Sequence, residues 1–155
     1  MTKAPDISAI REEFIERIGL ATQADNLPRI AGRIFGMMLF DGETVSFGDL
    51  ADRLDVSRAS ISTSVRLLEL KGLIRRTAKS GDRQDYFELM PDPYTSMIET
   101  ARKRTQTTRS DIAQTLSALP PTHDAKHRLQ GCAAFYDALD AGLDVAIQKI
   151  STSSN

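Results

Sequence analysis

The residues best suited to chemistry in this sequence are basic and gather in one short segment. Between Arg58 and Arg83, seven positive charges stand against two negative ones, which leaves +5. The whole chain has 20 Lys and Arg against 21 Asp and Glu, a net charge of −1. Bulk charge therefore predicts no attraction to a polyanion, whereas the local cluster can neutralise phosphates. Its members are Arg58, Arg66, Lys71, Arg75, Arg76, Lys79 and Arg83.

Small and hydroxylated residues accompany the first of these charges. If Ile61, Val65 and Leu68 form the buried stripe of a helix, a turn of ~100° per residue directs the residues between them outward. Short side chains allow close approach to a duplex, hydroxyls donate to phosphates or base edges, and an arginine can pair with guanine. Amide hydrogens at the helix start favour a phosphate. We therefore predict that this helix enters a major groove through Ser57, Arg58, Ala59, Ser62, Thr63 and Arg66.

A polar loop, residues 78–83, separates two short segments, 73–77 and 86–90, whose apolar residues are Leu73, Ile74, Tyr86, Phe87 and Leu89. This pattern predicts a β-hairpin with a basic tip. An arginine at such a tip can insert into a minor groove, and a neighbouring carboxylate can hold it in position. The predicted DNA-binding set therefore also includes Lys79, Asp82 and Arg83.

Other reactive residues form weaker patterns. His123 and His127 stand four apart beside Asp124, so a metal is conceivable, but no further ligand has suitable spacing. Cys132 lies between small residues and is expected to be packed, although a sensing role for it or the histidines stays open. No phosphate-binding loop or nucleophile motif occurs. We predict no metal, no cofactor and no enzyme activity.

The elements that position these residues are mostly helical. Helical periodicity covers residues 6–23, 28–40, 47–54, 57–71, about 25 residues after the break at 90–93, and 122–150. The two segments 47–54 and 57–71 are joined by about three residues, as in a helix-turn-helix. The predicted fold is mainly α with a small β-hairpin wing: a winged helix-turn-helix between long N- and C-terminal helices. We divide it into residues 1–27 for dimerisation, 28–91 for DNA binding, 92–150 for dimerisation and 151–155 as a flexible tail.

The first and last helices have apolar faces too extensive for one small domain to cover. Pairing with a second copy would bury them, so we predict a homodimer; a monomeric bundle that covers them internally is the alternative. Aromatic and sulfur-containing side chains between the DNA-binding part and the dimer helices could line a cavity for a small-molecule effector, or could be core. This candidate pocket comprises Phe14, Phe35, Met38, Tyr94, Met97 and Tyr136.

Composition agrees with one globular unit with appendages. The chain has 155 residues, of which 41% are hydrophobic and 26% charged. Its single cysteine excludes an intramolecular disulfide framework and fits a reducing cytoplasm. No apolar stretch approaches the ~20 residues needed to span a bilayer, and no secretory signal is visible. We expect a cytoplasmic protein that does not associate with membranes.

Several segments also resemble a known family. R29-I-A-G-R-I-F-G36, V56-S-R-A-S-I-S-T-S-V-R-L-L68, G72-L-I-R-R76 and G81-D-R-Q-D-Y-F87 are similar to MarR-type winged-helix transcriptional regulators, and to their GbsR-like branch in particular. The resemblance runs through about residues 27–90. It implies a dimeric bacterial regulator that binds a palindromic operator, usually as a repressor released by a small ligand. By motif position it assigns Ser57, Arg58, Ser62, Thr63 and Arg66 to the recognition helix and Asp82 and Arg83 to the wing. The alternative is a winged-helix scaffold for protein contacts that binds no DNA.

Overall fold

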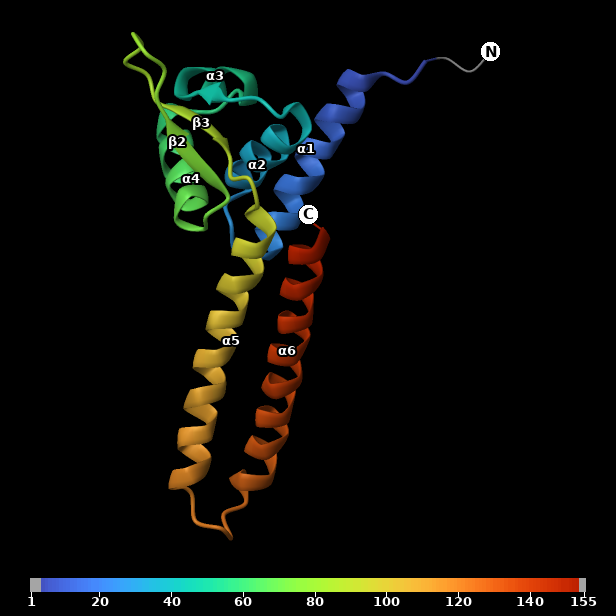
Figure 1. The fold of residues 1–155 in the computed structure, drawn as a ribbon, viewed down its shortest axis with the longest axis vertical. Helices are drawn as coiled ribbons and strands as arrows, with labels where there is room; N and C mark the ends of the chain where they lie inside the picture. Colours follow the sequence, from blue (N-terminus) through green and yellow to red (C-terminus); the bar gives the residue numbers. More distant parts are fainter. Residues whose placement is uncertain (1–3, 154–155) are drawn as a thin grey trace. The chain divides into compact units, whose positions relative to one another are not determined.

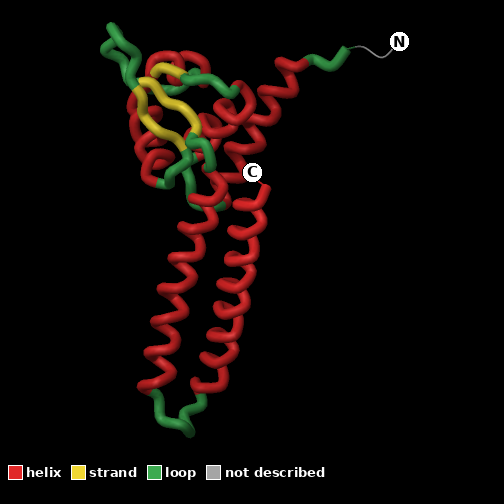
Figure 2. Tube along the Cα trace, in the orientation of Figure 1, coloured by secondary structure: helices red, strands yellow, loops and turns green. Residues whose placement is uncertain are grey.

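The computed structural model describes residues 4–153 of the chain, as six helices and one small sheet (Figures 1 and 2). The chain forms two compact units, one up to Pro93 and one from Tyr94 onward. The first unit contains α1 (Ile7–Ala24), α2 (Arg29–Asp41), β1 (Val45–Ser46), α3 (Phe47–Leu54), α4 (Arg58–Leu70), β2 (Ile74–Thr77) and β3 (Tyr86–Leu89). The second consists of α5 (Pro93–Ala118) and α6 (Ala125–Ser153).

The core of the first unit is built around α2. Ala31, Ile34, Met37 and Met38 have no exposed surface, as expected for a helix that is apolar around most of its circumference. α1 lies directly against it through glycines. A Cβ added at Gly32 would fall 1.8 Å from the hydroxyl of Thr22, so only glycine permits this crossing distance.

α3 and α4 form the predicted helix-turn-helix. Ser46 and Ser57 cap their N-termini, each accepting the backbone N–H three residues on. Asp55, which ends α3, has a φ of 51° and turns the chain toward α4. Buried apolar side chains join the two helices at Leu50, Leu54, Ile61, Val65 and Leu68.

The sheet has one strand more than the sequence predicted. The expected hairpin of β2 and β3 is present, and β1 pairs antiparallel with β3 to give the order β1-β3-β2. Val45 lies opposite Phe87 and Thr77 opposite Tyr86. Since β1 has two residues, its pairing rather than any alternation of its own defines it as a strand.

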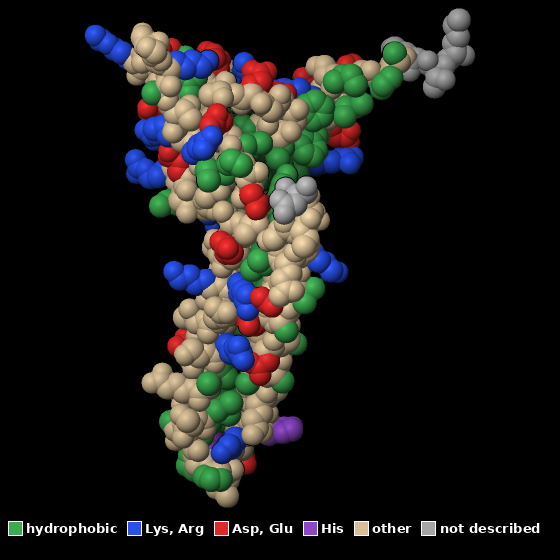
Figure 3. All heavy atoms as spheres, viewed as in Figure 1, with side chains coloured by type: hydrophobic (Ala, Val, Ile, Leu, Met, Phe, Trp, Pro, Cys, Tyr) green, Lys and Arg blue, Asp and Glu red, His purple; other side chains and the backbone are tan. Residues whose placement is uncertain are grey.

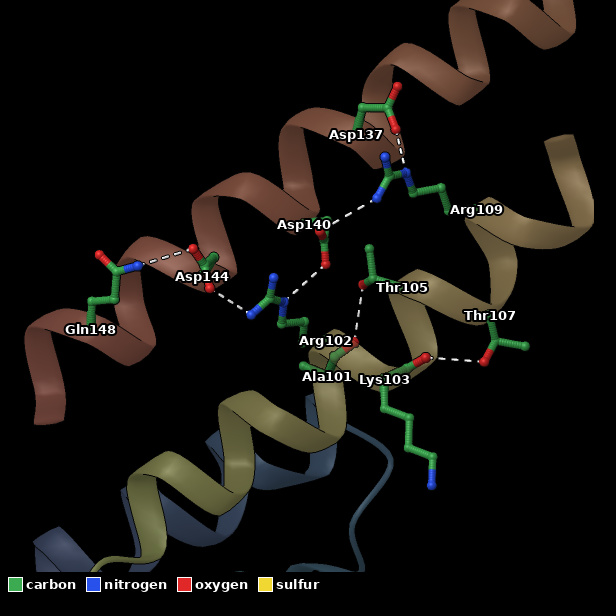
Figure 4. Close-up of polar contacts among 10 residues, drawn as sticks. All are labelled: Ala101, Arg102, Lys103, Thr105, Thr107, Arg109, Asp137, Asp140, Asp144 and Gln148. Carbon is green, nitrogen blue, oxygen red and sulfur yellow. Dashed lines mark hydrogen bonds and ion pairs between the residues drawn. The ribbon is translucent and has the colours of Figure 1, made fainter.

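The second unit is an antiparallel helical hairpin joined by polar contacts (Figure 4). Arg102 of α5 donates to Asp140 at 3.1 Å and to Asp144 at 2.6 Å, and Arg109 pairs with Asp137 and Asp140. Among the described residues from 94 onward, the buried side chains are Thr105 and Asp140, both polar. This hairpin therefore encloses little apolar surface of its own.

The ends of α6 differ from those predicted. The helix begins at Ala125 rather than Thr122 and continues to Ser153 rather than Ile150. The last two residues of the predicted tail, like the first three of the predicted N-terminal domain, lie outside the described part of the chain. The role of residues 1–27 and 92–150 in dimerisation stays a prediction. No helix within residues 4–153 has the length and apolar composition of a membrane span.

Candidate nucleic-acid interface

The outer face of α4 has the composition that the sequence indicated. Ser57, Arg58, Ala59, Ser62, Thr63 and Arg66 are all exposed. On the opposite face Ile61, Val65 and Leu68 have relative exposures of 0%, 1% and 0%. The Thr63 hydroxyl donates to the carbonyl of Ala59 within the helix, at 3.2 Å. The face is small, hydroxylated and basic, and it is sterically open.

Arg58, the first residue of α4, has a defined support. Its guanidinium lies 4.7 Å from the ring centroid of Phe47, the first residue of α3. A cation over an aromatic face is attracted by the ring quadrupole, so the charge is held near the N-terminus of α4 rather than moving freely. That end of the helix also presents backbone amides, which favour an anion.

The basic segment divides into paired and unpaired charges. Arg75 donates to Glu88 at 2.6 Å, and Arg76 bonds both Glu69 at 3.2 Å and Asp85 at 2.9 Å. Asp85 and Glu88 follow the segment counted in the sequence, so they reduce its local excess by two charges. In contrast, no ion pair to a described residue is formed by Arg58, Arg66, Lys71, Lys79 or Arg83.

Arg76 has a structural role that the sequence did not indicate. It joins Glu69 near the end of α4 to Asp85 immediately before β3, and its guanidinium lies 5.3 Å from the ring centroid of Phe87. The hydrogen bonds that Arg76 donates to the Glu69 carboxylate raise the pKa of Arg76. These contacts join the C-terminal part of α4 to β2 and to the residue before β3.

The loop between β2 and β3 extends away from the helices (Figure 2), and Lys and Arg side chains project from it and from the edge of the first unit beside it (Figure 3). Lys79, Asp82 and Arg83 are exposed, and Gly81 has a φ of 83° that favours glycine. The Asp82 carboxylate, expected to hold Arg83, accepts hydrogen bonds from Tyr86 Oη and from the backbone N–H of Gln84.

The histidines and the cysteine lie in different surroundings. His123 lies in the connection before α6 rather than on its first turn, and its Nδ1 accepts the backbone N–H of Ala125 at 3.1 Å. Cys132 is half-buried on α6. Within residues 4–153, no three His, Cys, Asp or Glu side chains are grouped as metal ligands.

The candidate effector pocket stays a prediction. Phe35 and Met38 are core residues of the first unit, and Phe14 contacts the ring of Phe40 with centroids 5.9 Å apart. Tyr94, Met97 and Tyr136 belong to the second unit, where Tyr94 and Met97 are 49% and 42% exposed. A different pocket, of about 540 Å³, lies within the first unit, lined by Glu16, Arg29, Ile30, Arg33, Leu54, Asp55 and Val56.

A capped helix-turn-helix followed by a hairpin with a basic loop defines a winged-helix DNA-binding protein. The MarR family model matches residues 25–85. The HTH-type transcriptional regulator MmpR5 of Mycobacterium tuberculosis is 35% identical over 133 residues, which are 83% of this chain and 78% of that protein. The chain belongs to the MarR family of transcriptional regulators, which are not enzymes. Its assignment to the GbsR-like branch stays a prediction.

Two further comparisons agree with this assignment. The putative HTH-type transcriptional regulator YvaV of Bacillus subtilis is 25% identical over 92 residues, covering 59% of this chain and 52% of that one. A crystal structure described as a transcriptional regulator superposes with a TM-score of 0.74 at 28% identity, covering 92% of this chain and 98% of the other. The similarity of fold therefore extends over both units.

Proposed function

We propose that this regulator is a repressor that binds a palindromic operator as a homodimer. In this proposal α4 enters the major groove, and the loop between β2 and β3 contacts the flanking minor groove. The observation that carries the proposal is the separation of charges: Arg75 and Arg76 are neutralised by carboxylates, whereas Arg66, on the exposed face of α4, forms no ion pair to a described residue.

The contacts available to α4 fall into two kinds. The N-terminal amides, Ser57 and Arg58 are suited to phosphates, which supply affinity without reading sequence. Thr63 and Arg66 lie farther along the exposed face, where hydroxyl and guanidinium groups can reach base edges. The absence of a bulky residue among Ala59, Ser62 and Thr63 supports close approach to the groove floor.

The second unit supports the homodimer. Its two helices join through Arg102, Arg109 and three aspartates and bury no apolar side chain among the described residues from 94 onward. Large apolar side chains remain exposed, with Phe135 at 62% and Val145 at 49%. A second copy would cover such surfaces, and its symmetry would place two α4 helices in major grooves ~10 bp apart.

Selection of bound duplexes from a random pool tests this function. Full-length protein should enrich an inverted repeat with half-sites ~10 bp apart, and its affinity should fall steeply with salt, with a log-log slope of about −0.9 per phosphate neutralised. An enriched single half-site would exclude the symmetric homodimer. Absence of enrichment, with duplex binding at background, would favour the protein-binding scaffold instead.

Repression rather than activation is tested by placing the selected operator across the start of a reporter gene, where expression should fall when the protein is present. We also propose that a small molecule releases the protein from its operator. A compound that weakens operator binding by the wild-type protein should have no effect on a folded variant in which Phe35 or Met38 is substituted.

A further inference from the structure

Tyr86 occupies a central place in the loop that the proposed function directs at the minor groove. It is the first residue of β3, and its backbone lies between Ser46 of β1 and Thr77 of β2. Because both neighbouring strands hold this residue, its side chain begins from a fixed point of the sheet. The ring then extends from this fixed base to the loop between β2 and β3, where it contacts Lys79 and Asp82.

Two loop residues contact this ring. The Lys79 ammonium lies 4.4 Å from the ring centroid, and the Tyr86 hydroxyl donates to Asp82 Oδ2. Lys79 stands on the side of the loop leaving β2, and Asp82 stands at its tip, where its own N–H donates to the carbonyl of Lys79 at 3.1 Å. Tyr86 thereby joins the first limb and the tip of the loop to the sheet.

The same hydrogen bond compensates the charge of Asp82. A bare carboxylate beside Arg83 would repel the phosphates that the loop approaches. Here the carboxylate accepts from Tyr86 Oη and from the backbone N–H of Gln84. These donors lower the pKa of Asp82 and the bond raises the pKa of Tyr86, so at neutral pH the pair is a carboxylate and a neutral phenol.

We propose that Tyr86 is a positioning residue for DNA binding: through Asp82 and Lys79 it holds the wing loop in the conformation that presents Arg83 to the minor groove. This inference rests on the proposed function, since it concerns how the loop is made ready for the duplex. Tyr86 itself need not touch DNA. Its effect comes from reducing the number of loop conformations that binding would otherwise have to order.

Tyr86→Phe tests the inference because it removes the hydroxyl and keeps the ring under Lys79. On the duplex enriched by selection, its affinity should fall about 3- to 10-fold, the range expected for one lost hydrogen bond. Hydroxyl-radical protection should weaken at the flanking minor grooves while the central major-groove contacts persist. Thr44→Val is the matched control, since it removes another hydroxyl-to-carboxylate bond of the same sheet, from Thr44 to Glu88 at 3.1 Å, away from the loop.

Asp82→Ala removes the acceptor of the same hydrogen bond. Because Asp82 is exposed, this substitution removes no buried side chain. If the pair acts together, the double variant should bind no more weakly than the weaker single variant. Additive losses, or Tyr86→Phe affinity within twofold of wild type, would overturn the inference while leaving DNA binding intact. A wild-type protein that selects no duplex would instead refute the proposed function, and this inference with it.

Discussion

At the scale of single residues, the interface depends on which arginines have been left without carboxylate partners. Arg76 is held by Glu69 and Asp85 and contributes to the orientation of α4 rather than to its charge. Arg66 has the same side chain ten positions earlier and no ion pair to a described residue. A free guanidinium retains all its donors for bases or phosphates, whereas a paired one must first give up its partner.

Substitution of Arg66 should therefore affect recognition of sequence. Arg66→Ala should cost roughly 1 to 3 kcal/mol of operator binding and relax discrimination at one base pair, because in the proposed complex Arg66 contacts a base. Lys79→Ala should weaken operator and random duplexes alike, because a lysine at the loop contacts the backbone. Titration of each variant with both duplexes checks this. Equal losses from the two variants on both duplexes would contradict the division of roles, and Arg75→Ala, which removes a neutralised charge, is the control.

At the scale of elements, local signals located the helices well. α3 begins at Phe47 and ends at Leu54 as predicted, because Ser46 provides a cap and the apolar spacing is strong. β1 was missed because two residues carry no periodicity; Val45 becomes a strand by pairing with Phe87, more than forty positions away. Burial of apolar side chains on α4 followed from spacing, but that of Ser64 did not, since a small polar residue gives no periodic signal.

The candidate interface was predictable to the same extent. The exposed face of α4 follows from helical geometry alone, so Thr63 and Arg66 could be assigned from the sequence. Tyr86 could not, because its role depends on a hydrogen bond across the hairpin to Asp82, set by strand register and loop conformation. The pairing of Arg76 with Glu69 depends in the same way on tertiary packing.

The close contact between α1 and α2 at Gly32 should contribute to the stability of the protein. Gly32→Ala should destabilise the protein by about 1 to 3 kcal/mol, because the added Cβ would meet Thr22 Oγ1 at 1.8 Å and the Cα of Gly19 at 2.9 Å. Gly142→Ala on α6 is the matched control: nothing lies within 4 Å of its Cβ position, and alanine in a helix should add about 0.5 to 1 kcal/mol. Denaturant unfolding of both variants measures the difference. If the Gly32→Ala and Gly142→Ala variants had the same free energy of unfolding, the contact between α1 and α2 would not require glycine at position 32.

At the scale of the whole molecule, the second unit depends on charge for its internal contacts. Asp140 is 8% exposed and accepts from Arg102, and this hydrogen bond holds its pKa below the ordinary value of 3.8. The folded state therefore binds this proton more weakly than the unfolded state. The stabilisation is fully present above about pH 4 and is lost as the pH falls through the lowered pKa.

Asp140→Asn removes this contribution and should reveal it as a function of pH. Near neutral pH the variant should unfold at lower denaturant concentration than wild type, because the amide leaves Arg102 and Arg109 without their shared charge. As the pH falls below about 4, the two proteins should converge, since wild-type Asp140 becomes neutral as well. Asp111→Asn, at an exposed position of α5, is the matched control and should unfold at the same denaturant concentration as wild type near neutral pH. A gap between wild type and Asp140→Asn that persists unchanged in acid would exclude this linkage.

The proposed homodimer requires an apolar surface that a second copy can cover, and α6 offers one. Phe135 and Leu139 are exposed one turn apart on α6, so they lie on one face of the helix. Asp at both positions would bring two carboxylates into any interface that covers this face, at a desolvation cost that a small interface cannot offset.

The double variant Phe135→Asp with Leu139→Asp should therefore sediment as a 17.1 kDa monomer, whereas wild type should have twice that mass. Its operator affinity should fall by at least about 100-fold, because two half-sites bound independently lose the gain from linkage. Gln130→Asp lies ~140° around the helix from Phe135 and should leave both mass and affinity unchanged. A double variant that remains dimeric and binds the operator normally would show that the dimer interface does not include this face of α6. A monomeric wild-type protein would contradict the homodimer and favour the monomeric bundle.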